Sequence, residues 1–392
     1  MMSSKRVWLV LAICIGALCL LSAIFFCLSG SNCEKVVYGD MEKKNYIPTI
    51  KASPANGETV NLLSGGIYAV ASAYEKGVAE QYFTREDSYA PESVEVAWTC
   101  EEGATGYTFL VSQSEDLEDA TSVELQDTAV VLSDLLAGTT YYYQIRAQYT
   151  DRVVYSKVFH FVTAQLPRTI SVPRVSNTRD IGGYITEDGK YRVRQGMVYR
   201  GGTLDYASKE SRQKILNVYH IRTDLDLRKK LSASPLGEDV NFISVDCPYY
   251  SNHGKGIDAP MYRSALATAI RSFADPDNYP IYVHCEIGRD RTGTVVFLIN
   301  SLLGVGQQDL LLDYELSFMS EAGCRDGQTP ATMMDAYITE MIDYINYYDF
   351  SFNDEGKDTK TFAEKTESFL LDIGITEEEI QAIRTILLEE VE

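Results

Sequence analysis

The sequence predicts a chain of three parts: an apolar N-terminal helix, an all-β sandwich and a C-terminal α/β domain. Three observations support this prediction. An uncharged run of 22 residues, Val7–Leu28, lies near the start of the chain. Short segments that alternate apolar and polar residues lie between positions 93 and 162. Apolar runs at 281–283 and 295–299 flank a short polar loop, as in a strand, tight turn and helix. We expect the three parts at residues 1–33, 48–166 and 168–392.

The charge balance of the chain excludes one class of partner. Acidic residues number 56 and basic residues 35, which gives a formal net charge of −21 at pH 7. The backbone of a nucleic acid would be repelled by such a chain, so we expect no nucleic-acid partner. The apolar content of 45% is ordinary for a globular protein and supplies enough side chains for hydrophobic cores.

The apolar run near the N-terminus has the features of an export signal. Lys5 and Arg6 precede it, and basic residues on this flank keep the N-terminus inside the cell. Val7–Leu28 is long enough to span a bilayer. We therefore expect a single-pass membrane anchor, with the C-terminal domain outside the cytoplasmic membrane. The alternative is a signal cleaved near Ser29–Ser31, which would give a secreted protein.

A β-rich segment lies between the expected anchor and the last domain. We expect strands at residues 93–98, 106–111 and 153–162, and a turn followed by a strand within residues 135–147. Short strands separated by turns favour a sandwich. The segment resembles a fibronectin type III domain, because Trp98 stands at the core tryptophan position and Tyr141 follows Gly138-Thr139 as in a tyrosine corner. Residues 50–90 are longer than a first strand needs and contain an insertion that the pattern does not place.

The decapeptide His284–Gly293 carries the chemistry. It reads His-Cys-Glu-Ile-Gly-Arg-Asp-Arg-Thr-Gly, with Cys285 six residues before Arg291. A loop between a strand and a helix can turn its backbone N–H groups inward around an anion, with the helix N-terminus behind them. These dipoles and Arg291 favour negative charge on Cys285, and a thiolate is a far better nucleophile than a thiol. The pattern therefore predicts a phosphate-binding loop with a nucleophile at its base.

Each residue type in this loop has a use in displacement at phosphorus through a cysteinyl-phosphate. The planar fork of Arg291 holds two phosphate oxygens, and Gly288 lets the backbone come close. Thr292 can donate its hydroxyl to the cysteine sulfur when that sulfur is the leaving group. The residues that we expect around the phosphate are His284, which orients the loop, Glu286, Ile287, Gly288, Arg289 and Gly293.

The loop is similar to that of the cysteine-dependent protein tyrosine phosphatases, and more narrowly to the bacterial tyrosine and dual-specificity group whose loop reads HCxxGKDRTG. Further segments resemble motifs of that group, in the same order. They are residues 177–184 (N-x-R-D-[LI]-G-G), 199–202 ([YF]-R-S-x), 224–228 (D-L-R), 302–305, 313–317 and 369–380. The resemblance covers residues 168–392. It implies a mostly parallel sheet flanked by helices, with the loop at the carboxyl end of a strand.

Two positions depart from the pattern of that group. Arg289 replaces the usual lysine, which keeps a positive charge at the rim of the loop. Gly201 stands where the group often has serine, which puts one hydrogen bond to the site in question.

The leaving oxygen of a phenyl phosphate needs a proton, so a carboxyl group must lie within hydrogen-bond reach of it. The resemblance favours Asp290, beside the loop arginine, or Asp226, at the end of a predicted strand, and Asp290 is our preferred candidate. The alternative is that Asp290 only pairs with a basic neighbour and Asp226 with Arg228. We expect Asp180 to brace the loop together with Arg179.

Four cysteines fall in the folded part of the chain, at positions 100, 247, 285 and 324. Exported proteins usually oxidise paired thiols, yet Cys285 must stay free to react. Cys247 is either a reversible disulfide partner of Cys285 or, as we favour, a small buried apolar residue.

The resemblance implies a phosphomonoester hydrolase that needs no metal and no cofactor. Three of the four histidines, at positions 160, 220 and 253, lack metal-ligand spacing. The expected substrate is phosphotyrosine in a protein, with dual specificity as an extension. One alternative is a phosphoinositide or inositol phosphate, whose extra phosphates Arg289 would serve. A second is an inactive phosphate-binding or adhesive surface protein, against which the intact Cys285 and Arg291 argue.

Overall fold

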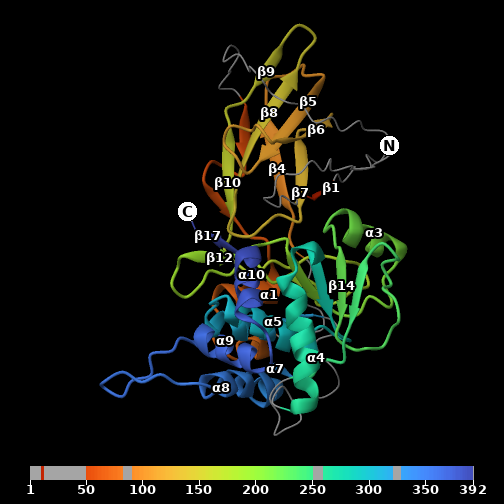
Figure 1. Ribbon diagram of the computed structural model, residues 1–392. Coiled ribbons are helices and arrows are strands. Elements are labelled where there is room, and N and C mark those ends of the chain that lie inside the picture. Colours follow the sequence, from red (N-terminus) through yellow and green to blue (C-terminus); the bar gives the residue numbers. More distant parts are fainter. Residues whose placement is uncertain (1–9, 13–49, 83–90, 250–258, 321–327, 392) are drawn as a thin grey trace. The chain divides into compact units, whose positions relative to one another are not determined.

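The computed structural model describes residues 10–12, 50–82, 91–249, 259–320 and 328–391 (Figure 1). The chain forms two compact units. The first comprises Met1–Leu62 with Glu92–Gln165, and the second Leu63–Pro91 with Leu166–Glu392. The second unit thus contains the predicted C-terminal domain and, in addition, a segment that the sequence pattern does not place.

Two sheets make up the first unit. One has the strand order β1-β7-β4-β2, and the other β3-β10-β8-β5-β6 with β9 paired to β8. The bounds are β1 Val10–Ala12, β2 Lys51–Ser53, β3 Glu58–Val60, β4 Val94–Thr99, β5 Gly106–Ser112, β6 Thr121–Leu125, β7 Ala129–Ser133, β8 Thr140–Gln148, β9 Val153–Tyr155 and β10 Phe159–Thr163. The strands expected near 93–98 and 106–111 are confirmed, as are the turn and strand expected within 135–147, and the strand expected at 153–162 is split into β9 and β10.

One hydrophobic core lies between these two sheets. Trp98 of β4 stacks on Phe109 of β5, with 6.1 Å between the ring centroids, so the two sheets meet there. Successive residues of a strand point to opposite faces, and β8 accordingly buries Tyr141 and Tyr143 while Tyr142 lies on the other face. The first unit is therefore a β-rich region with its own core.

The predicted N-terminal helix, Val7–Leu28, lies outside the described residues except for Val10–Ala12. Those three residues form β1, which pairs in parallel with β7. Among the described residues, no helix is both long enough and apolar enough to span a bilayer.

The second unit is built on a five-stranded sheet of order β11-β13-β16-β14-β15. Its bounds are β11 Arg179–Asp180, β13 Val198–Gly201, β14 Thr223–Asp226, β15 Asn241–Ser244 and β16 Ile281–His284. The last four strands run parallel, and β11 runs antiparallel to β13. Every residue of β13, β14 and β16 is buried, as expected for parallel strands covered on both faces. The central strand, β16, leads into the predicted phosphate loop.

Helices surround this sheet (Figure 1). Their bounds are α1 Gly65–Ser72, α2 Ala79–Tyr82, α3 Lys209–Asn217, α4 Pro260–Arg271, α5 Asp290–Leu302, α6 Gln307–Glu315, α7 Pro330–Met334, α8 Glu340–Asn346, α9 Phe362–Asp372 and α10 Glu377–Leu387. Single turns lie at η1 Ser272–Ala274, η2 Pro276–Asn278 and η3 Leu316–Met319, and a π-helical turn, η4, at Asp335–Thr339. A two-stranded sheet joins β12 Tyr191–Val193 to β17 Leu388–Glu390.

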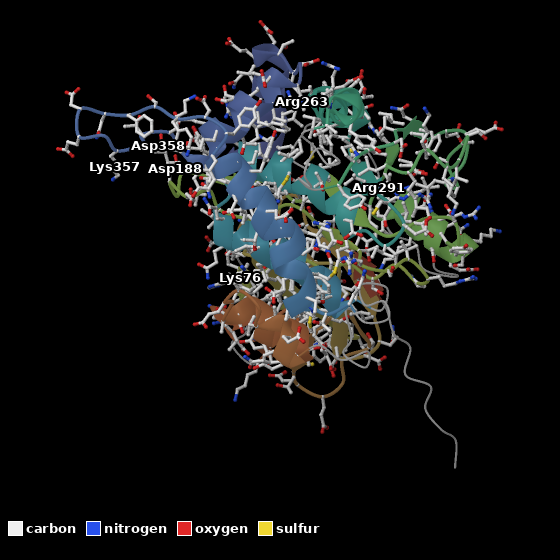
Figure 2. All side chains as sticks on the ribbon, turned by 90° about the horizontal axis from the view of Figure 1, so that it is seen from below. Lys76, Asp188, Arg263, Arg291, Lys357 and Asp358 are labelled. Atoms are coloured by element: carbon white, nitrogen blue, oxygen red, sulfur yellow. The ribbon has the colours of Figure 1, made fainter. Side chains whose placement is uncertain are left out.

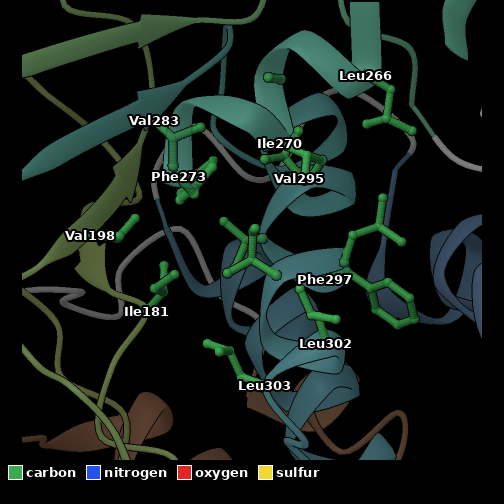
Figure 3. Packing of buried hydrophobic residues seen from close by; sticks show 14 of the residues in the cluster. Ile181, Val198, Leu266, Ile270, Phe273, Val283, Val295, Phe297, Leu302 and Leu303 are labelled. Atoms are coloured by element: carbon green, nitrogen blue, oxygen red, sulfur yellow. The ribbon is translucent and has the colours of Figure 1, made fainter. Parts of the chain in front are cut away.

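Helix α5 runs through the core of the second unit. All of its residues from Thr292 to Leu302 are buried, and a helix that is buried on every side belongs to a core. Figure 3 shows Val295 of α5 among Val283 of β16 and Ile270 of α4. This packing fixes the N-terminus of α5 at the end of β16, where the loop between them must turn sharply.

Candidate active site

The loop 285–289 joins the carboxyl end of β16 to the first turn of α5. Cys285 follows the strand directly and is 3% exposed, at the base of the loop. The first N–H groups of a helix have no partner within the helix, so the start of α5 offers donors to an anion held here. The predicted order of strand, tight loop and helix is confirmed.

Gly288 has two reasons to be glycine. Its φ is +73°, a conformation that L-residues with side chains rarely adopt. A Cβ at this position would also lie 2.4 Å from the carbonyl carbon and oxygen of Gly201 and 2.8 Å from the nitrogen of Gly202. The loop is therefore packed directly on the backbone that follows β13.

Three consecutive carbonyl groups of the loop are held by donors outside it. The carbonyl of Glu286 accepts from the N–H of Thr203 at 3.1 Å. The carbonyl of Ile287 accepts from the Asn177 side chain at 3.0 Å, and that of Gly288 accepts from Arg200 at 2.7 Å.

The outward direction of these carbonyls determines where the amides point. In a trans peptide the C=O of one residue and the N–H of the next point in opposite directions. The N–H groups of residues 287, 288 and 289 consequently face the interior of the loop. For Ile287 and Gly288, no described residue accepts a hydrogen bond from the backbone N–H. The loop is thus a cradle of inward amide dipoles, which is an anion site.

Asp313 of α6 anchors the two arginines that hold this cradle. One carboxylate oxygen accepts from Arg179 Nε at 2.8 Å, and the other accepts from Arg200. Arg179 in turn donates to the side-chain oxygen of Asn177 at 2.5 Å. Burial would raise the pKa of Asp313, but the positive charges of Arg179 and Arg200 outweigh it, and the pKa is lowered. Asp313 and Asn177 were not among the predicted site residues, although both lie in segments that resemble family motifs.

Arg179 and Asp180 do not brace the loop together, contrary to expectation. Arg179 reaches the loop through Asn177, whereas Asp180 forms a buried ion pair with Arg168 at 2.8 Å. Asp180 also accepts from the backbone N–H groups of Gly182 at 2.8 Å and Gly196 at 2.6 Å. Burial raises the pKa of Asp180 despite the opposing charge of Arg168. These three partners all lie outside the loop, so Asp180 braces the turn after β11 instead.

His284 faces two acceptors at the end of β16. One ring nitrogen lies 2.8 Å from the carboxylate of Asp224, and the other lies 3.2 Å from the carbonyl of Cys285. Burial favours the neutral ring, but the hydrogen bond and charge of Asp224 outweigh it, so the pKa of His284 is raised above 6.5. Ser234 donates to the second oxygen of Asp224 at 2.6 Å. His284 thus orients the loop, as predicted, and Asp224 is a partner that the sequence analysis did not identify.

Both carboxylate oxygens of Asp226 accept hydrogen bonds from Arg228. One oxygen accepts from Arg228 Nε at 2.8 Å and the other from Arg228 Nη2 at 2.9 Å. Arg228 also donates to Asp205 at 2.9 Å and to Glu286 of the loop at 3.1 Å. Lys230 adds a contact to Asp205 at 3.1 Å. The carboxylates of this network tie the side of the loop at Glu286 to β14, which matches the structural alternative for Asp226.

Arg289 does not stand at the rim. Its side chain is 2% exposed and lies over the ring of Phe318, 4.9 Å from the centroid. It donates to Asp290 at 2.9 Å and to Gln328 at 2.9 Å. The predicted rim charge is therefore wrong, because the aromatic face of η3 gives the guanidinium a buried place. Asp290, whose side chain is 30% exposed, is the more accessible member of this pair.

Arg291 and Thr292, at the start of α5, have polar groups that are available to a bound phosphate. Arg291, labelled in Figure 2, is half-buried at the start of α5. No carboxylate of the described residues forms an ion pair with it. The hydroxyl of Thr292 is buried and has no hydrogen-bond partner among the described residues. Gly293 instead closes the first helical turn by donating its N–H to Arg289 at 2.9 Å. The unpaired guanidinium and hydroxyl suit a phosphate held above Cys285.

Two other positions complete the surroundings of the nucleophile. A Cβ at Gly201 would lie 2.1 Å from the hydroxyl of Tyr282, which fills the place of a side chain there and donates to the carbonyl of Gly202 at 3.0 Å. Cys247 and Cys285 are both free thiols. Burial raises the pKa of Cys247 despite the nearby charge of Arg291.

Comparison with known proteins agrees with this geometry. The model of the tyrosine phosphatase family matches residues 170–389. The chain belongs to the tyrosine phosphatase family. A protein of Cupriavidus necator named as a tyrosine-protein phosphatase is 28% identical over 192 residues, which cover 40% of this chain and 68% of that protein. Another so named, from Dictyostelium discoideum, is 26% identical over 87 residues, covering 22% of this chain and half of that protein.

One solved structure also overlaps with the chain. It is the core catalytic domain of the PP-IP phosphatase SIW14 from S. cerevisiae in complex with citrate, at 17% identity and a TM-score of 0.26. The overlap covers 38% of this chain and 85% of that chain. A likeness of this extent carries no argument about the fold or the substrate of the present chain.

Proposed function

We propose that this member of the family hydrolyses phosphate monoesters, with protein phosphotyrosine as the main substrate, through a cysteinyl-phosphate. The observation that carries the proposal is the set of three carbonyls at residues 286–288 that accept from donors outside the loop, which turns the three following amides toward the interior of the loop that begins at Cys285. The guanidinium of Arg291, which forms no ion pair with a carboxylate of the described residues, adds a planar fork for two phosphate oxygens.

The reaction has two displacements at phosphorus. The thiolate of Cys285 attacks, and a sulfur–phosphorus bond forms as the bond from phosphorus to the leaving oxygen breaks. The leaving oxygen takes a proton from a general acid. Water then attacks the cysteinyl-phosphate and gives a proton to the carboxylate that the general acid became in the first step. The sulfur–phosphorus bond breaks and phosphate leaves, while the hydroxyl of Thr292 stabilises the departing sulfur. The inward amides and Arg291 stabilise the charge on the transferring phosphoryl group in both steps.

We assign the general acid to Asp290. It stands one residue before Arg291 and is 30% exposed, so it can reach a leaving oxygen at the mouth of the loop. Asp226 suits this role less well, because Arg228 donates to both of its oxygens and the side chain is buried. Removal of Asp226 would instead release Arg228 from its main anchor.

Charge around the loop favours a substrate with a single phosphate. Glu286, 44% exposed in its side chain, places a carboxylate beside the cradle. Arg289, the residue that would serve additional phosphates, is buried and already engaged. A second phosphate on an inositol ring would therefore not be met by Arg289, and beside Glu286 it would compete with a carboxylate for Arg228 and Lys230, which already pair with that carboxylate.

The direct test compares the parent chain with Cys285→Ser on an aryl phosphate, a phosphotyrosine peptide and an inositol phosphate. We expect turnover of the first two substrates by the parent and none above background by the variant. Equal rates for parent and variant would show that Cys285 does not catalyse the reaction. Faster turnover of the inositol phosphate than of the peptide would show that inositol phosphates, and not protein phosphotyrosine, are the main substrate class.

We further propose that the first unit is a fibronectin type III-like module and that the chain is exported, either tethered by Val7–Leu28 or secreted. Support for the module is the sheet order and a hydrogen bond from the N–H of Leu136 to the hydroxyl of Tyr141 at 2.9 Å, as in a tyrosine corner. Support for export is the basic flank and apolar run of the sequence. Protease treatment of intact cells would degrade an externally tethered chain and spare a cytoplasmic one.

A further inference from the structure

Residues 63–82, which we call the strap, pack on the catalytic unit although in sequence they lie between β3 and β4 of the first unit. They include α1 and α2, and they lie outside the span that the family model matches. Apolar side chains of the strap share a buried cluster with three residues of α6 and η3. The members on the strap are Leu63, Ile67, Val70, Ala71, Tyr74 and Ala79, and those on α6 and η3 are Leu312, Leu316 and Met319.

Glu315 is the polar centre of this contact. It is fully buried, and one oxygen accepts from the hydroxyl of Tyr74 at 2.7 Å and from the N–H of Gly77 at 3.1 Å. Its other oxygen accepts from the N–H of Ala79 at 3.0 Å. Burial and the adjacent charge of Glu315 raise the pKa of Tyr74, so its hydroxyl stays protonated and donates. A buried carboxylate is tolerated only with such donors, and the strap supplies all three of these.

Helix α6 is held on two opposite sides. Asp313 and Glu315 are two residues apart, which is about 200° around a helix. Asp313 therefore faces Arg179 and Arg200, which hold the phosphate loop, while Glu315 faces the strap.

The next two elements, η3 and α7, also lie between the phosphate loop and the strap. In η3, Phe318 lies under Arg289 of the loop, whereas Leu316 and Met319 pack on the strap. At the start of α7, the N–H of Ala331 donates to Glu80 of the strap at 2.9 Å, and nearby Gln328 accepts from Arg289. Three supports of the loop thus each have a strap contact. Figure 2 labels Lys76, which marks the strap between α1 and α2 beside these helices.

We propose that the strap is a positioning element of the phosphate loop, and that Glu315 is the residue through which it acts. By fixing α6 and η3, it fixes the distance from Asp313 to Arg200 and so the direction of the Gly288 carbonyl. The catalytic unit is then discontinuous in sequence, and a fragment that begins at residue 168 would lack part of its support. This inference rests on the proposed function, since it concerns how tightly the same loop holds phosphate.

The test uses the full chain and two variants. Glu315→Gln replaces an acceptor oxygen with an NH2 group that faces the strap donors, and Tyr74→Phe removes one hydrogen bond while keeping the ring. Tyr68→Phe is the matched control, because Tyr68 lies in the same strap with a 37% exposed side chain. The readouts are the dissociation constant for inorganic phosphate, KM and kcat, all measured well below the unfolding temperature.

We expect Glu315→Gln to weaken phosphate binding and raise KM by about 3- to 10-fold, Tyr74→Phe by about 2-fold, and Tyr68→Phe to change neither. A lower unfolding temperature with unchanged phosphate affinity in both variants would overturn the inference and leave the strap a purely structural part. If Glu315→Gln does not fold, unchanged affinity in Tyr74→Phe alone overturns it. A parent that binds phosphate but turns over no ester would overturn the proposed function, and phosphate affinity would still decide this inference.

Discussion

Arg200 joins the phosphate loop to helix α6: one arm of its guanidinium donates to the carbonyl of Gly288 at 2.7 Å, and the other donates to Asp313. Both side chains are buried, so neither contact is screened by solvent. The direction of one loop carbonyl, and hence of the amide that follows it, depends on an arginine and a carboxylate that lie 113 residues apart in the sequence.

Arg200→Lys should lower kcat/KM by about 10- to 100-fold, because a lysine cannot reach Gly288 and Asp313 together and a small shift of the cradle misplaces the phosphoryl group. Steady-state kinetics on an aryl phosphate measure this effect. Arg271→Lys is the control, since Arg271 forms an exposed pair with Glu379. Equal kinetics for both variants would show that the fork at position 200 has no bearing on the site.

Gly288→Ala should destabilise the fold and abolish activity. The control is Gly189→Ala, because Gly189 has nearly the same φ, +71°, but nothing within 4 Å of the position that a Cβ would take, whereas at Gly288 that position lies 2.4 Å from Gly201. We expect Gly189→Ala to cost about 1–2 kcal/mol from backbone strain alone, with kcat/KM unchanged. A clearly larger loss is expected at Gly288. Urea unfolding of both variants provides the comparison, and equal losses would rule out the close packing of the loop on Gly201.

Asp290→Asn should lower kcat by about 10²- to 10⁴-fold on phenyl phosphate, since that leaving group needs a proton. The loss should be far smaller on an aryl phosphate whose phenol is already acidic, and the limb of the pH profile that reports the acid should disappear. Asp226→Asn should instead lower the unfolding temperature, and any loss of kcat should be the same on the two substrates. If the loss of kcat depends on the acidity of the leaving phenol in Asp226→Asn and not in Asp290→Asn, the two roles are exchanged.

Asp224→Asn should reduce stability most in mildly acidic solution. The pKa of His284 is raised in the folded state, so its contribution to stability is present below its ordinary pKa of 6.5 and is lost as the pH rises through the folded value. The difference in free energy of unfolding between parent and Asp224→Asn should therefore be largest near about pH 6 and should shrink at higher pH. Asp239→Asn, at an exposed position, should give a small difference that does not vary with pH. A difference in free energy of unfolding between parent and Asp224→Asn that grows with pH would contradict an ion pair between His284 and Asp224.

The local parts of the site were predictable and the distant partners were not. Cys285, Gly288 and Arg291 lie within one short loop, so their spacing and the apolar runs on either side fix their setting. The prediction that Asp180 braces the loop together with Arg179 failed, because Asp180 pairs with Arg168, while Arg179 is held by Asp313, 134 residues away. Arg289 was expected at the rim, but its burial depends on Phe318, which no local pattern links to the loop.

The same limit applies to the fold. Alternation found several strands of the first unit, and apolar runs found β16 and α5. The strap could not be assigned, because its apolar face is explained only by Leu312, Leu316 and Met319, more than 200 residues later. A buried carboxylate such as Glu315 gives no signal in a sequence, since acidic residues are usually exposed.

The most direct measurement of the central claim is rapid acid quenching of the enzyme during turnover of an aryl phosphate, followed by peptide mass spectrometry. We predict that the peptide containing Cys285 gains the mass of one phosphoryl group, and that the adduct is absent from Cys285→Ser. Sustained turnover by Cys285→Ser, or a phosphoryl group on any other residue of the active parent, would contradict the account.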